Sequence, residues 1–179
     1  MDQIPEDIHL RPPKEILEIA QQFIGSETEP VKARYPVEYD PIRRYCQMTG
    51  ETNPLYLDKE YAKKTKHGEV LCPALMLGYF GGLGNWPPVT PDRPALRTTI
   101  PLPPQDGPRR GINLATDSTF YKPVKVGDHL SAKSKVADVY MKAIKSDPEC
   151  IWTRTERIFT NQDDEVVAVM ANTLITYKK

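Results

Sequence analysis

Long apolar runs are missing from this sequence, and their absence limits where the chain is expected to work. No stretch approaches the ~20 apolar residues that a transmembrane helix needs, so we expect no membrane span. The first fifteen residues lack the basic start and apolar core of a signal peptide, so we expect no secretory export. Acidic and basic residues balance at 24 each, and this zero net charge gives no reason to expect nucleic acid as a partner.

Cysteine and histidine are also scarce, with three of each in 179 residues. Cys46, Cys72 and Cys150 lie far apart among apolar neighbours, which predicts reduced, buried thiols of a cytoplasmic protein. The histidines share no ligand spacing with one another or with the cysteines, so we expect no metal site. Glycine-rich phosphate loops, a Rossmann fingerprint and nucleophile motifs are absent as well, and we expect no bound cofactor.

The N-terminal part of the sequence has mainly helical signals. Residues 14–24 show helical apolar spacing. Residues 31–39 alternate strictly between apolar and polar, which predicts a half-buried strand. Because the stretch contains Pro36, we expect this strand at an edge of the sheet. A helix is predicted over 40–49, with Asp40 as its N-cap and Gly50 as its stop, and a second short helix follows Asp58.

The C-terminal part predicts a sheet built around one apolar helix. Residues 70–84 are apolar on every side of a helix that starts at Pro73, which predicts burial all round. Four β-rich segments follow at 112–121, 129–141, 150–160 and 165–177, and their short links imply antiparallel pairing. The chain is therefore predicted to be one α+β domain over 1–179, with a helical extension over about 1–25 and a proline-rich excursion over about 85–111.

A compact polar turn, GETNPLYLD at 50–58, separates the two middle helices. The turn either simply ends one helix and begins the next, or it holds side chains for catalysis. Two other segments accompany it in order, CPAL at 72–75 and FYKPVKVGDHL at 120–130. Together the three resemble the MaoC-type hotdog-fold family of (R)-specific enoyl-CoA hydratases and dehydratases, over roughly residues 25–177. The resemblance is nearest to the N-terminal, FAS1-like dehydratase domain of that family.

The resemblance implies a long sheet wrapped around a central helix, and addition of water to trans-2-enoyl-CoA thioesters. Coenzyme A enters as part of the substrate. In the family an aspartate and a histidine of the turn activate the water, and N–H groups at the helix start stabilise the thioester oxygen. Here Glu51 stands at the aspartate's position and Tyr56 at the histidine's, while Asn53 is kept. The N–H of Ala74 remains a candidate oxyanion donor, whereas Pro73 has none.

These replacements weaken the expected chemistry. The extra methylene of Glu51 displaces its carboxylate, and tyrosine, with a reference pKa near ~10, is a poor base. Each candidate catalytic residue also has a structural alternative: Glu51 as a solvated carboxylate, Asn53 as a turn-stabilising amide and Tyr56 as a wall or core aromatic. Three basic residues are candidate contacts for the CoA phosphates, or else solvated charges: Arg109, Arg110 and Lys122.

The resemblance leaves three functional hypotheses open. The first is a subunit that lacks the dyad and shapes the acyl and CoA site beside a hotdog partner that carries it, acting on fatty or sterol side-chain thioesters. The second is a self-sufficient homodimeric hydratase that uses Glu51. The third is a non-catalytic acyl-CoA binding module. The proline-rich segment 85–111 is expected to form a lid over the acyl tunnel, because it directly follows the helix that should face the thioester.

Overall fold

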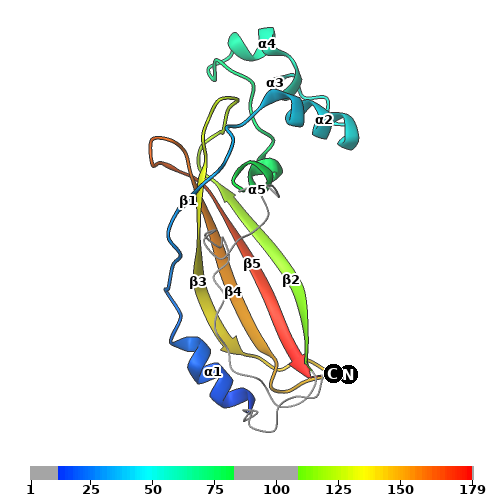
Figure 1. The fold of residues 1–179 in the computed structure, drawn as a ribbon. Coiled ribbons are helices and arrows are strands. Elements are labelled where there is room, and N and C mark those ends of the chain that lie inside the picture. Colours follow the sequence, from blue (N-terminus) through cyan, green and yellow to red (C-terminus); the bar gives the residue numbers. More distant parts are fainter. Residues whose placement is uncertain (1–11, 83–108, 179) are drawn as a thin grey trace, which may run out of the picture.

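A computed structural model describes residues 12–82 and 109–178 (Figure 1). Helices make up most of the first described range, and a sheet makes up the second. The helical elements are α1 (Pro13–Gln21), α2 (Tyr39–Thr49), α3 (Pro54–Leu57), α4 (Lys59–Lys63), the 3-10 turn η1 (Ala74–Met76) and α5 (Leu77–Phe80). The strands are β1 (Val31–Lys32), β2 (Arg109–Phe120), β3 (Ser131–Met141), β4 (Ile151–Thr160) and β5 (Val166–Lys178). Most of the segment predicted to form a lid lies outside the described residues.

The five strands form one antiparallel sheet in the order β1-β3-β4-β5-β2. The predicted pairing of successive strands is confirmed for β3 with β4 and for β4 with β5. It is wrong for β2, which pairs with β5 and not with β3, the next strand in the sequence. The architecture is α+β. One boundary was predicted wrongly: residues 109–111, assigned to the proline-rich excursion, are the first residues of β2 and pair with the end of β5. Their ladder partners lie more than 60 residues away in the sequence, so no local pattern marks them as strand.

The predicted edge strand is much shorter than the alternation indicated. Only Val31 and Lys32 form a strand, and Tyr35 is exposed. The edge position is confirmed, because the segment runs alongside β3 and the residues just before it. The N–H groups of Ala33 and Val37 donate to the carbonyls of Leu130 and Asp128, both at 2.8 Å. Regular pairing stops ahead of Pro36, which has no N–H to donate.

The helix over 40–49 begins one residue earlier than predicted. Glu38 is the N-cap residue of α2, without a side-chain cap, and Asp40 lies inside the first turn. The carboxylate of Asp40 instead pairs with Arg43 at 2.7 Å and Arg44 at 2.6 Å. An acidic side chain in the first turn favours the helix dipole, so the residue still stabilises the helix start. The left-handed stop at Gly50, with φ 71°, is confirmed.

The central apolar helix is only partly buried in this chain. Pro73 precedes a 3-10 turn, and Leu75 and Tyr79 are 72% and 68% exposed. Figure 1 shows α5 lying at one end of the sheet, so one side of the helix meets the strands and the other does not. The prediction of burial all round is therefore wrong for the described residues. The apolar composition of a helix does not specify how many of its sides are covered by its own sheet.

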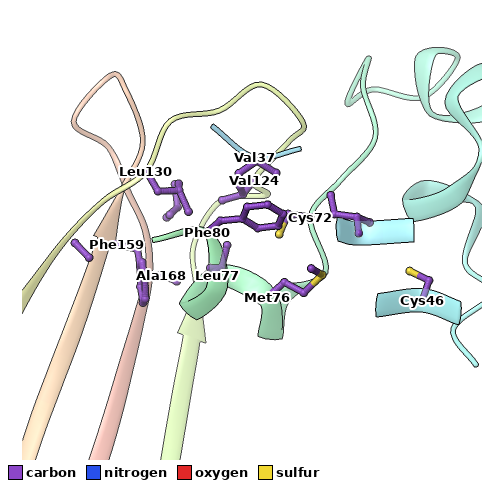
Figure 2. Packing of buried hydrophobic residues seen from close by; sticks show 13 residues of the cluster. Val37, Cys46, Cys72, Met76, Leu77, Phe80, Val124, Leu130, Phe159 and Ala168 are labelled. Carbon is purple, nitrogen blue, oxygen red and sulfur yellow. The ribbon is translucent and has the colours of Figure 1, made fainter. Parts of the chain in front are cut away.

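The buried side of η1–α5 joins the main hydrophobic core. Figure 2 shows this core extending from Phe159 and Ala168 on the sheet, through Phe80, to Met76 and Cys46. A second, smaller cluster forms where α1 packs on β3, and its buried members are Ile16, Ala20, Val136, Val139 and Ile151.

None of the helices in the described ranges has the length and apolar content needed to cross a bilayer.

A buried carboxylate links three chain segments at the end of the sheet opposite α5. Asp147, only 4% exposed, accepts hydrogen bonds from the N–H of Lys178 at 2.6 Å and of Glu149 at 2.9 Å. The guanidinium of Arg109 lies 3.5 Å away. Burial raises the pKa of Asp147, but the two backbone hydrogen bonds and the charge of Arg109 outweigh it, so the net pKa is lowered.

We predict that Asp147→Asn lowers the free energy of unfolding by about 2 kcal/mol, because an amide cannot accept all of these bonds. A lowered folded-state pKa gives stability that is present above the unfolded-state pKa and lost as pH falls through the folded value. The difference between wild type and variant in urea unfolding should therefore shrink below about pH 4. Asp138→Asn, on an exposed carboxylate of β3, is the control and should have no effect. A constant difference down to strongly acid pH would contradict the assignment.

Candidate active site

The turn between α2 and α4 is held by its own backbone and two side chains. After Gly50, the carboxylate of Glu51 accepts a hydrogen bond from the N–H of Asn53 at 2.9 Å. The side-chain oxygen of Asn53 accepts from the N–H of Leu55 at 3.0 Å and so caps α3. Asp58 caps α4 in the same way through the N–H of Tyr61, as predicted. The short helix α3 was not predicted, although Asn53–Pro54 is a typical N-cap and first-turn pair.

One backbone hydrogen bond joins this turn to the segment that leads into the central helix. The N–H of Leu71 donates to the carbonyl of Leu55 at 3.0 Å. The next residue, Cys72, donates its N–H to the carbonyl of Val124 at 2.8 Å. Tyr56 therefore lies near the start of η1, where the N–H of Ala74 has no partner within the helix. Of the predicted site residues, Glu51, Asn53 and Tyr56 share the turn, and the bond from Leu71 ties the turn to the segment that leads to Ala74.

Tyr56 is half-buried and packs against the main core. Burial raises the pKa of its phenol, and the negative charge of Glu51 raises it further. A phenol with a raised pKa stays protonated at neutral pH, so it can donate a hydrogen bond but cannot act as a general base. The carboxylate of Glu51 is exposed, and one of its oxygens is engaged by the turn. The dyad positions therefore hold a neutral donor and a solvated carboxylate.

The three basic candidates do not lie together. Lys122 follows the end of β2 nearest α5 and forms an ion pair with Glu165. Arg109 starts the same strand, so about 37 Å of extended chain separates it from Phe120. Its side chain is buried against Asp147, and Arg110 beside it is exposed. Contact with CoA phosphates stays a prediction for all three, but only Lys122 lies at the end of the sheet that carries the turn.

The sequence did not single out Cys72 as part of this region. It is buried beside Tyr56 in the core, and burial together with the charge of Asp128 raises the pKa of its thiol to about 12. Burial also raises the pKa of Cys46, with a further contribution from Glu51. The only sequence signal was the position of Cys72 directly before Pro73. Two buried thiols with raised pKa values, Cys46 and Cys72, therefore lie near Tyr56 together with the carboxylate of Glu51.

The sequence matches the FAS1-like dehydratase domain region over residues 22–170. The chain belongs to this MaoC-like family. The motifs at 50–58, 72–75 and 120–130 were therefore correctly assigned, and all three fall within the match.

Two sequence relatives carry the names of hydratase subunits. A probable enoyl-CoA hydratase alpha subunit of Thermomonospora curvata is 27% identical over 161 residues, which cover 88% of this chain and 50% of the relative. The 3-oxo-4,17-pregnadiene-20-carboxyl-CoA hydratase alpha subunit of Mycobacterium tuberculosis is 25% identical over 162 residues, covering 89% and 51%. The chain thus spans about half the length of these relatives.

Solved structures confirm the hotdog fold. The ChsH1–ChsH2 complex from Mycobacterium tuberculosis contains a chain that matches with a TM-score of 0.69 at 18% identity, covering 93% of this chain and 91% of that one. A MaoC-like dehydratase from Rhodospirillum rubrum matches with a TM-score of 0.57 at 19% identity, covering 87% and 93%. At these identities the likeness establishes the fold alone.

We predict that Asn53→Ala lowers the free energy of unfolding by about 1 kcal/mol, because α3 loses its cap. Asn53→Asp, which keeps an acceptor oxygen at the same place, should be nearly neutral in the same urea titration. Equal losses in both variants would mean that the amide nitrogen, rather than the cap, stabilises the turn.

We predict that none of the three cysteines reacts with a thiol reagent in the folded protein at neutral pH. All three are buried with raised pKa values, so the reactive thiolate is scarce. Mass spectrometry after iodoacetamide treatment should show no adduct in buffer and three adducts in denaturant. Rapid labelling of Cys72 in buffer would contradict its placement in the core.

Proposed function

We propose that this chain is a hotdog subunit of an enoyl-CoA hydratase or dehydratase that lacks the catalytic dyad and shapes the acyl and CoA site beside a dyad-bearing partner. One observation carries the proposal: the turn keeps its structural residues while its chemical positions are changed. Gly50 and Asn53 hold the backbone, whereas Glu51 is solvated and Tyr56 is a protonated, half-buried phenol.

The comparisons support a heteromeric arrangement. The names of both sequence relatives describe alpha subunits, and two structural neighbours are named as complexes, ChsH1–ChsH2 and HadBC. In the proposed assembly the substrate is a trans-2-enoyl-CoA with a fatty or sterol side-chain acyl group, and no separate cofactor is needed. Ala74 contributes its N–H to the thioester oxygen, and Lys122 contacts a CoA phosphate.

The test is hydration of trans-2-butenoyl-CoA, followed by loss of the conjugated thioester absorbance. We expect no turnover by the pure chain, but measurable binding of butanoyl-CoA by calorimetry. Turnover should appear when the chain is mixed with a hotdog subunit of the same family that carries the aspartate and histidine, and Glu51→Gln in this chain should leave that rate unchanged.

Two outcomes would replace the proposal. Turnover by the pure chain that disappears in Glu51→Gln would identify a self-sufficient enzyme in which this carboxylate acts as the base. Binding of butanoyl-CoA without turnover beside any dyad-bearing subunit would identify an acyl-CoA binding module.

A further inference from the structure

The inner face of the sheet, on which α5 packs, changes from apolar to polar just beyond the main core. Phe159 on β4 and Ala168 on β5 belong to that core (Figure 2), and they form a row with Phe120 on β2. Every second residue of a strand points to the same face, so the register gives the next rows of the inner face. These rows are Arg157, Met170 and Ser118, and then Thr155, Asn172 and Thr116. All of these side chains except that of Met170 can form hydrogen bonds.

The guanidinium of Arg157 is positioned by two neighbours, and neither of them is acidic. It donates to the carbonyl of Gly81 at 3.1 Å and lies over the ring of Phe159, 5.0 Å from the ring centroid. Its Nε is buried and has no hydrogen-bond partner in the described part of the chain. Burial lowers the pKa of this side chain, the reverse of what a carboxylate beside it would do.

Two other arginines of the sheet do have carboxylate partners. Arg154, on the opposite face, pairs with Asp117 at 2.8 Å, and Arg109 lies 3.5 Å from Asp147. Among the described residues, Arg157 pairs with no carboxylate. Arginine stays protonated at neutral pH, so its charge here is uncompensated. A buried charge without a partner is costly, and an anion bound beside it would offset that cost.

Arg157 lies at the opposite end of the central helix from the N–H that is proposed to hold the thioester. From Ala74, η1 and α5 lead to Gly81, a span of about 10–12 Å. An acyl group held by its thioester at Ala74 and lying along this helix would bring its far end to the guanidinium. A planar guanidinium binds a carboxylate through two parallel hydrogen bonds, which suits it to an acyl group that ends in a carboxylate.

We propose that Arg157 is a specificity-determining residue that binds a carboxylate at the far end of the acyl group. The substrate class is then CoA thioesters of dicarboxylic acids, in which one carboxyl group is joined to CoA and the other is free. Ser118 in the same row and Thr155 in the next row add hydroxyl groups to this part of the inner face. The inference rests on the proposed function, because it requires the thioester to be held at Ala74.

The experiment is calorimetric titration of the pure chain with octanoyl-CoA and with octanedioyl-CoA, which differ only in the terminal methyl or carboxylate group. Arg157→Gln removes the charge, and Arg157→Lys keeps the charge without the planar fork. Arg154→Gln is the matched control, because it removes an arginine from the opposite face of the same strand. Circular dichroism checks that each variant is folded, and the comparison of the two thioesters in wild type depends on no variant.

We expect wild type to bind octanedioyl-CoA about tenfold more tightly than octanoyl-CoA, because a charge-assisted hydrogen bond is added. Arg157→Gln should remove this preference and leave the binding of octanoyl-CoA unchanged. Arg157→Lys should retain part of the preference, and Arg154→Gln should keep it in full.

Three results would overturn the carboxylate site. Equal affinity of wild type for the two thioesters would refute it and leave the proposed function standing. Equal losses for both thioesters in Arg157→Gln would mean that this arginine holds α5 or contacts the CoA portion instead. Binding of neither thioester by wild type would refute the acyl site of the proposed function and the carboxylate site with it.

Discussion

The position of the central helix depends on one close contact, that between Gly81 and the ring of Phe159. A Cβ added at Gly81 would lie 2.5 Å from a ring carbon of Phe159, so only glycine lets the end of α5 approach β4 this closely. The guanidinium of Arg157 donates to the carbonyl of Gly81 at 3.1 Å, where a positive charge favours the C-terminal end of a helix. A helix of four residues has little stability of its own. The start of η1, and with it the N–H of Ala74, is therefore positioned by the sheet.

In the turn at 50–58, the residues that set the backbone differ from those at the two positions proposed to have lost the dyad. Its shape comes from the positive φ of Gly50, the cap at Asn53 and the bond between Leu55 and Leu71. The side chain of Tyr56 contributes packing to that shape, and its N–H donates to the carbonyl of Asn53 at 3.0 Å. Glu51 closes one hydrogen bond, which an aspartate is also suited to make. The chemistry of this turn can therefore change while its backbone stays the same.

Local signals in the sequence predicted the elements that depend on local interactions. Gly50 as a helix stop, Asp58 as a cap and the four long strands each follow from neighbouring residues. Features set by distant contacts were not predictable. Arg109 belongs to β2 because of pairing with β5 and an ion pair with Asp147, 38 residues away. Likewise, the exposure of Leu75 depends on where α5 meets the sheet, which its apolar composition does not specify.

For the proposed contact with a CoA phosphate, the existing ion pairs favour Lys122 over Arg109. Lys122 and Glu165 form an exposed pair, and such pairs contribute only about 0–1 kcal/mol, so a doubly charged phosphate can displace the carboxylate. Arg109 is buried with Asp147, and separating them would leave an uncompensated charge at a cost of several kcal/mol, roughly 3–5. Lys122 also lies at the same end of the sheet as the turn. A phosphate can therefore replace the carboxylate partner of Lys122 without rearranging the fold. Replacing the partner of Arg109 would open the opposite end of the sheet.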